Sequence, residues 1–173
     1  MKNLEKDKLQ SLLDIMGSNP SLQIAHFTQE SNLLTQMLYE YCNKRDYLYQ
    51  INCTDLTFYE EMSNRFKDEK KVQIRNFSLD RKSYMMQGKQ YDFLFVSTPI
   101  TENIKSDFLK RVHNIICNAG NIIIFIDKEN KEECYDWTKL LEEHNYVATN
   151  TISDLCKHYS IIISKKMHGW GSL

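Results

Sequence analysis

The chain has 173 residues, of which 42% are hydrophobic and 26% are charged, and its formal net charge is −1. This length and apolar content predict one globular domain, residues 1–173, with a substantial core. The near balance of 22 basic and 23 acidic residues argues against recruitment of nucleic acid or anionic lipid by overall charge. The longest apolar run, residues 122–126, is far too short to span a bilayer, so we expect no membrane partner.

The cysteines are odd in number and form no CxxC pair: Cys42, Cys53, Cys117, Cys134 and Cys156. They predict free thiols in a reducing compartment, and hence a cytoplasmic protein, rather than a disulfide framework. Because the cysteines and histidines lack the clustered spacing of zinc ligands, no metal site is expected. The sequence also lacks Walker, GxGxxG and GxSxG motifs, which argues against ATP hydrolysis, dinucleotide redox chemistry and serine hydrolysis.

Helical and strand periodicities alternate along the chain, starting with a charged N-terminal helix in residues 1–17. Gly17-Ser18-Asn19-Pro20 stops that helix, and Asn118-Ala119-Gly120 stops a later one. Thr57-x-x-Glu60 reads as a capping box at another helix start. A short polar helix or loop is expected over 80–90. The remaining helices are expected near 33–42, after 57, at 108–116 and at 134–141, and strands at 21–27, 47–53, 71–77, 91–97, 121–126, 146–152 and 158–164.

This alternation predicts a parallel, doubly wound sheet between two helical layers. The last two strands are separated by about five residues, whereas a parallel crossover needs roughly a dozen, so they must form an antiparallel hairpin. The fourth, fifth and seventh strands are continuously apolar and should be central, whereas the third and sixth alternate with polar residues and suit edges. The fold expected is therefore a three-layer α/β Rossmann-like domain with strand order 3-2-1-4-5-7-6 and an extra N-terminal helix.

Residues 20–166 resemble a class I S-adenosylmethionine-dependent methyltransferase in the order of these elements. The segment 91–96 (YDFLFV) resembles the fourth strand of that family, and residues 108–124, including Asn118-Ala119-Gly120-Asn121, resemble its following helix, turn and fifth strand. The resemblance implies S-adenosylmethionine as cofactor. Residues 167–173 then form a C-terminal tail beyond the core.

The glycine loop of the family is missing from this chain. In the family, an acidic residue at the end of the first strand precedes a Gly-x-Gly-x-Gly loop, whose glycines let the backbone approach the cofactor. Gln23 stands here at the acid, and Ala25, Phe27 and Gln29 stand at the three glycines. The ring of Phe27 would occupy the place of the cofactor, and a shifted alignment does not help, because no glycine occurs between 17 and 88.

The resemblance assigns the remaining cofactor contacts residue by residue. Asn52, or Asp55 with a shifted loop, would bind the ribose, and Asp80 would lie on the adenine side. Ser97 would also face the cofactor, with Thr98 and Pro99 toward the methyl acceptor. Only this single proline is shared with the Asn/Asp-Pro-Pro-aromatic motif of amino-methylating members, so the sequence does not support recognition of an amine substrate.

Ligands of open α/β sheets bind beyond the carboxyl ends of the strands. His26 at this edge reads as a general base or as a hydrogen-bonded structural residue, and the polar loops read either as a small-molecule cleft or as ordinary solvated turns. The side chains expected at this edge are His26, Thr28, Glu30, Asn52, Thr54, Asp55, Ser78, Asp80, Ser97, Thr98, Asp127 and Lys128.

Two further segments bear on partners. Residues 65–89 are locally basic with interleaved acids, which is typical of a solvated face and leaves a weak RNA or DNA contact as the alternative. His168 and Trp170 lie in the tail, where an aromatic side chain either docks onto its own domain or contacts a protein partner or a second copy of the chain.

Three functions are consistent with these patterns. The first is a divergent methyltransferase-like protein that does not bind the cofactor in the usual way and acts as a non-catalytic binding or scaffolding module. The second is an active methyltransferase with a rebuilt cofactor loop, since methyl transfer needs mainly the positioning of two reactants. The third is a SIS-like Rossmann regulatory domain, which a wholly parallel sheet would indicate.

Overall fold

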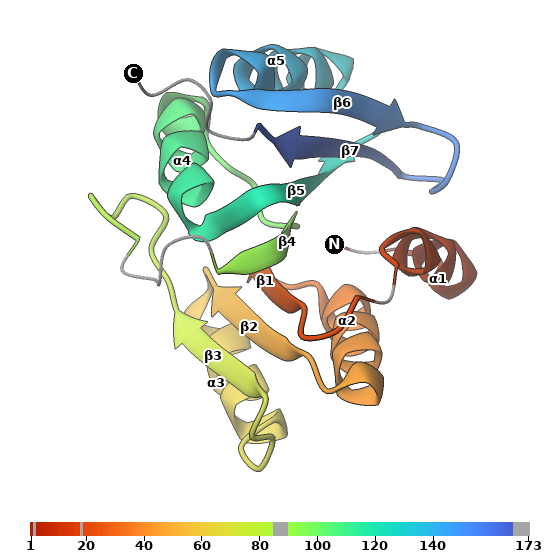
Figure 1. Ribbon diagram of the computed structural model, residues 1–173, viewed down its shortest axis with the longest axis vertical. Coiled ribbons are helices and arrows are strands. Elements are labelled where there is room, and N and C mark those ends of the chain that lie inside the picture. The colour runs from red at the N-terminus through yellow and green to blue at the C-terminus, as the bar shows by residue number, and fades with distance from the viewer. Residues whose placement is uncertain (2, 18, 85–89, 168–173) are drawn as a thin grey trace.

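One mixed sheet forms the centre of the computed structural model, whose described residues are 1, 3–17, 19–84 and 90–167. The strands within this part of the chain lie side by side in the order β3-β2-β1-β4-β5-β7-β6, which confirms the predicted order (Figure 1). Their bounds are β1 (Gln23–Thr28), β2 (Leu48–Cys53), β3 (Val72–Asn76), β4 (Tyr91–Val96), β5 (Ile116–Asp127), β6 (Tyr146–Ile152) and β7 (Tyr159–Lys166).

Strand direction separates the two ends of the sheet. The pairs β3–β2, β2–β1, β1–β4 and β4–β5 are parallel, whereas β7 runs antiparallel to both β5 and β6. The connection between β6 and β7 is too short to cross the sheet, so the chain must turn back as a hairpin. This hairpin distinguishes the fold from the wholly parallel sheet of the SIS-like alternative.

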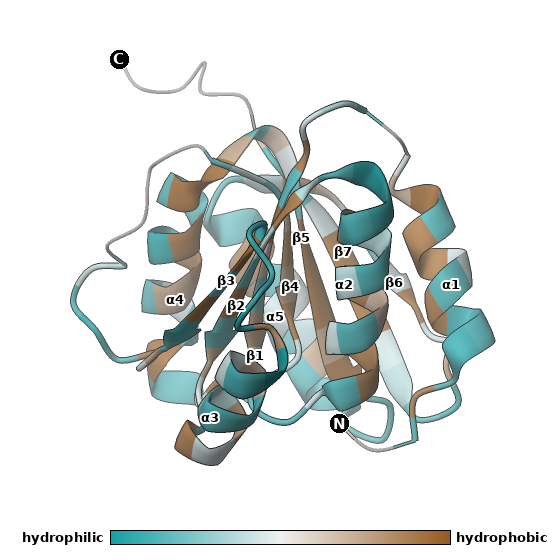
Figure 2. Cartoon of the chain, turned by 90° about the horizontal axis from the view of Figure 1, so that it is seen from below, coloured by the Kyte–Doolittle hydropathy of each residue, from teal (hydrophilic) through white to brown (hydrophobic). Residues whose placement is uncertain are grey.

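Helices cover both faces of the sheet and complete the three predicted layers. One face carries α1 (Lys6–Ile15), α2 (Asn32–Arg45) and α3 (Leu56–Arg65), and the other carries α4 (Glu102–Ile115) and α5 (Lys131–Glu143). Figure 2 shows hydrophobic strands between helices that are hydrophilic on their outer sides. No helix in the described part of the chain is long and apolar enough to cross a membrane.

The central strands contribute side chains to the hydrophobic core on each face of the sheet, because successive side chains point to opposite faces. In β1, Ile24 packs under α1 and α2, whereas Ala25 and Phe27 pack under α4. In contrast, β3 and β6 keep alternating exposed residues, as predicted for the edges of the sheet. The burial pattern therefore explains which strands lie inside and which lie outside.

The junction between α4 and β5 differs from the sequence prediction. The helix ends at Ile115, and β5 begins at once with Ile116, which pairs with Tyr91 of β4. The predicted stop Asn118-Ala119-Gly120 therefore lies inside the strand, where the register shifts and Ala119 adopts a φ of 64°. A Cβ on Gly120 would lie 2.6 Å from a methyl group of Ile116, so this irregular segment requires glycine.

Three other boundaries also differ. The first strand begins at Gln23 and continues to Thr28, and the last continues to Lys166. The α3 helix is capped not by Thr57 and Glu60 but by Asp55, whose Oδ1 accepts a hydrogen bond from the backbone N–H of Phe58 at 2.8 Å. The prediction failed there because both residues belong to the first turns of the helix itself.

All five cysteines are free. Cys42, Cys53 and Cys156 are buried, and Cys117 and Cys134 are half-buried. Burial raises the pKa of the Cys42 and Cys53 thiols to about 12, so both stay protonated and act as small apolar groups.

Candidate functional site at the carboxyl edge of the sheet

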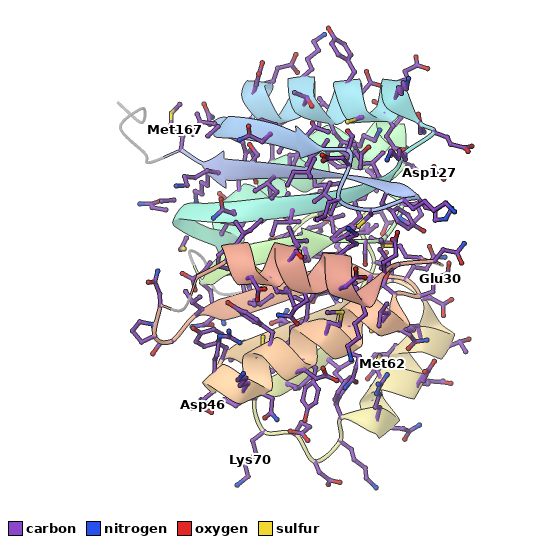
Figure 3. All side chains as sticks on the ribbon, turned by 90° about the vertical axis from the view of Figure 1, so that its right-hand side faces the viewer. Glu30, Asp46, Met62, Lys70, Asp127 and Met167 are labelled. Atoms are coloured by element: carbon purple, nitrogen blue, oxygen red, sulfur yellow. The ribbon has the colours of Figure 1, made fainter. Side chains whose placement is uncertain are left out.

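The carboxyl ends of the five parallel strands form one edge of the sheet. Glu30 follows β1 and Asp127 ends β5, and both lie at this edge, opposite to Met167 (Figure 3). The chain enters the sheet at β1 and extends to β2 on one side and to β4 on the other. The crevice of a doubly wound fold lies where the strand order reverses in this way, between β1 and β4.

Two predicted cofactor residues, Ala25 and Phe27, lie within β1 rather than in the loop that follows it. Both are fully buried, and the ring of Phe27 packs edge-on against Phe77 and Phe108 with centroid distances of 5.1 and 5.4 Å. The loop after the first strand is instead residues 29–31, which also contains no glycine. The Phe27 ring is therefore part of the core under α4 and does not project into the crevice.

Other predicted cofactor residues form hydrogen bonds within the fold. Asn52 is fully buried, and its Oδ1 accepts a hydrogen bond from Gln50 at 2.9 Å. Asp55 caps α3 as described above. Asp80 is exposed, and its carboxylate accepts a hydrogen bond from the hydroxyl of Ser78. The Asn52 Nδ2 group has no partner among the described residues.

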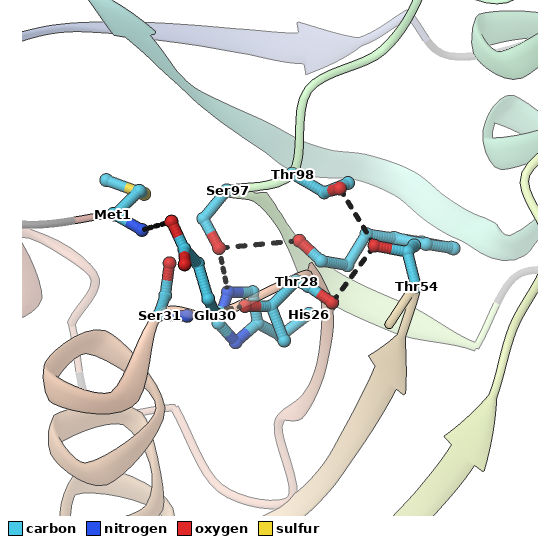
Figure 4. A network of polar contacts seen from close by, with 9 residues as sticks. Met1, His26, Thr28, Glu30, Ser31, Thr54, Ser97 and Thr98 are labelled. Atoms are coloured by element: carbon cyan, nitrogen blue, oxygen red, sulfur yellow. Dashed lines mark hydrogen bonds and ion pairs between the residues drawn. The ribbon is translucent and has the colours of Figure 1, made fainter. Parts of the chain in front are cut away.

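Ser97, predicted on the cofactor side, is hydrogen-bonded to two residues of β1 and is linked through one of them to β2. Its Oγ lies 2.7 Å from Nε2 of His26 (Figure 4). The other ring nitrogen of His26, Nδ1, lies 2.9 Å from the hydroxyl of Tyr49. The backbone N–H of Ser97 also donates to the carbonyl of Phe27 at 2.9 Å. Ser97 is 6% exposed, so this chain of contacts runs from the edge of the sheet into the core.

His26 lies below the edge rather than on it. Its imidazole is fully buried beside Tyr49 and Phe95, and this burial lowers its pKa to about 3. A neutral imidazole donates one hydrogen bond and accepts one, which matches the two hydroxyl groups in contact with it. His26 therefore positions Ser97, and forming an imidazolium there would be costly. The geometry favours the hydrogen-bonded interpretation over a general base.

Threonine side chains bridge the crevice above His26. The hydroxyl groups of Thr54 and Thr98 lie 2.9 Å apart, and Thr54 donates to the carbonyl of Thr28 through its backbone N–H at 2.9 Å and its hydroxyl at 3.3 Å (Figure 4). Thr28 in turn accepts a hydrogen bond from the backbone N–H of Ser31. These contacts join the ends of β2, β1 and β4, so they narrow the crevice between those strands.

An open cavity remains beside this bridge, over β1, β4 and β5. It has a volume of about 260 Å³, and we call it the rim pocket. The predicted site residues Ser97, Thr98 and Pro99 lie together in its lining, whereas Asp55 and Asp80 do not line it. The structure therefore brings together the residues after β4 but not the predicted ribose and adenine contacts.

The rim pocket is acidic and partly aromatic. Glu30, Asp127 and Glu133 line it together with Trp137 and Tyr159. The α-ammonium group of Met1 lies in it, 3.2 Å from the carboxylate of Glu30.

One cation compensates part of this charge from below. Lys105 is 3% exposed, and its Nζ lies 2.7 Å from Glu102, 3.7 Å from Glu133 and 5.3 Å from the centre of the Trp137 ring. Among the described residues, Lys105 lies near Glu133 and the α-ammonium group of Met1 pairs with Glu30, so Asp127 is the carboxylate of the lining that no ion pair compensates.

Sequence reasoning missed four residues of this site. Glu133, Trp137 and Tyr159 line the pocket from the first turns of α5 and the start of β7, and Tyr49, the second residue of β2, contacts His26. The i, i+4 spacing of Glu133 and Trp137 indicates a shared helix face, but not that the face reaches this edge.

The described residues contain no group of three or more His, Cys, Asp or Glu that could hold a metal ion. His168 and Trp170 lie outside the described residues.

Comparisons with known proteins match the fold but not the sequence. No family model and no curated protein matches the chain. A SAM-dependent O-methyltransferase from Thermotoga maritima has a TM-score of 0.75 at 11% identity, covering 96% of this chain and 67% of its own. A SAM-dependent methyltransferase from Aquifex aeolicus has a TM-score of 0.72 at 11% identity, covering 94% and 90%. The CurJ carbon methyltransferase has a TM-score of 0.71 at 10% identity, covering 92% of this chain.

This chain spans only about half of the CurJ methyltransferase, 52% of its length. At sequence identities near 10%, the similarity shows that the helices and strands are arranged alike. It does not show that the site residues are the same. The strand order, the antiparallel β7 and the similarity to these structures together establish that the chain has a class I methyltransferase-like fold.

Proposed function

We propose that the chain is a non-catalytic binding module built on a methyltransferase-like fold, and that its rim pocket takes a small organic amine in its ammonium form. One observation carries the proposal. The residues that the resemblance assigns to the cofactor are largely engaged by the fold, whereas carboxylates line the pocket that remains open. Ala25, Phe27 and Asn52 are fully buried, and Asp55 caps a helix.

The class of ligand follows from the charge and size of the pocket. Glu30 and Asp127, two exposed carboxylates of the lining, favour a cation. Tyr159, which is half-buried, adds aromatic surface, which also attracts cations. The volume of about 260 Å³ lies just below the range of roughly 300–1,000 Å³ common for drug-sized ligands, which favours a ligand smaller than a nucleoside cofactor.

Calorimetric titration tests this proposal, with n-butylamine and putrescine as cationic probes and butyrate as the anionic one. We expect heat from the amines only. Glu30→Gln and Asp127→Asn should each weaken amine binding by about 2- to 5-fold, the scale of an ion pair at an exposed carboxylate. Glu129→Gln is the matched control, because Glu129 is an exposed carboxylate two residues from Asp127 that does not line the pocket.

An active methyltransferase is the second candidate, supported by the position of Ser97, Thr98 and Pro99 at the crevice between β1 and β4. The same titration includes S-adenosylmethionine and S-adenosylhomocysteine. Micromolar binding of both, with no heat from the small amines, would favour the enzyme over the binding module. Equal affinity of an amine for the wild-type protein and both carboxylate variants would reject the acidic pocket as the site.

A further inference from the structure

A second and larger hollow lies at the opposite edge of the sheet, by the amino ends of the strands. It has a volume of about 460 Å³ and lies between the last turn of α1 and the first residues of β4 and β5. We call it the amino-edge groove. Its residues play no part in the rim pocket, so its occupant is independent of the proposed function.

Apolar side chains form two walls of the groove. Phe93, Ile123 and Ile163 line it from the sheet, and Phe93 and Ile163 are only half-buried. Leu12 and Ile15 line it from α1, where Ile15 is 69% exposed. An isoleucine with this exposure beside half-buried apolar residues leaves a surface that an apolar group would cover favourably.

A hydrogen-bond acceptor lies in the same groove. The carboxylate of Asp92 accepts from the backbone N–H of Gln23 at 2.8 Å and from the thiol of Cys117 at 3.4 Å. A carboxylate has about four acceptor sites, so Asp92 can accept a further donor. The groove therefore suits a side chain with a large apolar body and one N–H donor, which describes the indole of tryptophan.

The chain carries such a side chain within reach of the groove. Lys165, near the end of β7, lines it, and the backbone N–H of Met167 pairs with the carbonyl of Asn145 at 3.0 Å. Trp170 follows three residues later, a span of about 10 Å for an extended chain. Gly169 and Gly171 flank it and permit the backbone to turn.

We propose that residues 168–173 fold back and place the indole of Trp170 in the amino-edge groove of the same chain. In this arrangement the indole N–H donates to Asp92, and its ring covers Ile15, Phe93 and Ile163. The tail would then complete the apolar face between α1 and β7, which the described helices leave partly open.

Tryptophan fluorescence of the full chain tests the proposal. The chain has two tryptophans, and Trp137 is 2% exposed, so subtracting the spectrum of Trp170→Phe isolates the emission of Trp170. We expect blue-shifted emission and an acrylamide quenching constant severalfold below that of a free tail peptide. Ile15→Lys should raise the quenching constant of Trp170 to the peptide value.

Leu56→Lys is the matched control, because Leu56 is 57% exposed on α3 and does not line the groove. Ile15→Ser is a milder second variant in case lysine disturbs α1, which circular dichroism would reveal. Sedimentation in the same buffer reports the oligomeric state. Solvent-exposed Trp170 in the wild-type chain, or protection unaffected by both Ile15 variants, would overturn the proposal. Protection found only in a dimer would overturn it in favour of the tail of a second copy.

Discussion

The structure places Phe27 in the core, whereas alignment with the methyltransferase family places it at a glycine of the cofactor loop. If Phe27 blocked a cofactor loop, shortening its side chain would open a site at little cost in stability. The structure instead buries the ring completely among Phe77, Tyr84 and Phe108, at centroid distances of 5.1, 5.9 and 5.4 Å. Removing it should therefore leave a cavity in the core under α4.

The expected loss of stability follows from that burial. Truncating a fully buried phenylalanine to alanine typically costs about 3–5 kcal/mol. Three aromatic neighbours and complete burial place Phe27→Ala near the middle of that range, about 4 kcal/mol. Phe27→Gly should cost about 0.5–1 kcal/mol more, because glycine also loses backbone entropy in a strand. Since a domain of this kind has about 5–15 kcal/mol in total, the alanine variant is the one to measure first.

Urea unfolding followed by circular dichroism provides the assay. The midpoint should fall without a change in the m-value, which shows that stability rather than compactness changed. Tyr135→Ala is the control, because Tyr135 is 70% exposed and its removal should stay within about 0.5 kcal/mol. A loss below about 1 kcal/mol for Phe27→Ala, or new binding of S-adenosylmethionine by that variant, would refute the placement of the ring in the core.

Three other measurements probe individual contacts. Burial lowers the pKa of His26 to about 3. Below pH 6.5 the unfolded chain therefore binds a proton at this histidine that the folded chain excludes. The free energy of unfolding should fall by about 1.4 kcal/mol per pH unit as the pH drops from 6.5. His26→Gln should remove that part of the slope, and equal slopes in both proteins between pH 7 and 4.5 would contradict it. Lys166→Met should cost about 1–3 kcal/mol, because Lys166 donates to the carbonyls of His113 and Ile116 at 2.5 and 2.8 Å; Lys165→Met in the same urea series should have little effect. Asp55→Ala should cost about 1 kcal/mol through the lost α3 cap, with Asp55→Ser retaining most of it, and a change in amine binding would show that Asp55 is not merely structural.

The order of the strands could be predicted because it depends on local features of the chain. The alternation of periods predicts parallel crossovers, and the short connection before Tyr159 permits only an antiparallel return. The continuous apolar run in β5 and the alternating pattern in β6 predict which strands are central and which lie at an edge. Each of these signals spans a few neighbouring residues, so it can be read without the tertiary structure.

The end of β1 could not be predicted in the same way. Thr28 looks like a loop residue but is fully buried, because its hydroxyl accepts a hydrogen bond from the backbone of Ser31 and its carbonyl accepts from Thr54. Ala25 and Phe27, which the resemblance aligns with loop glycines, therefore lie well inside the strand and in the core. Similarly, the pairing of Ile116 with Tyr91 extends β5 across a sequence that resembles a helix stop.

The sequence by itself determined the α/β class, the strand order and the absence of a glycine loop, since periodicity, connection length and residue type are properties of the chain. Only the tertiary structure decided which polar groups meet. His26 contacts Tyr49 and Ser97, which lie 23 and 71 residues away, because β1 pairs with β2 on one side and with β4 on the other. The acidic lining of the rim pocket likewise combines residues from separate elements. Hydrogen-bond partners depend on register between distant strands, and no local pattern encodes that register.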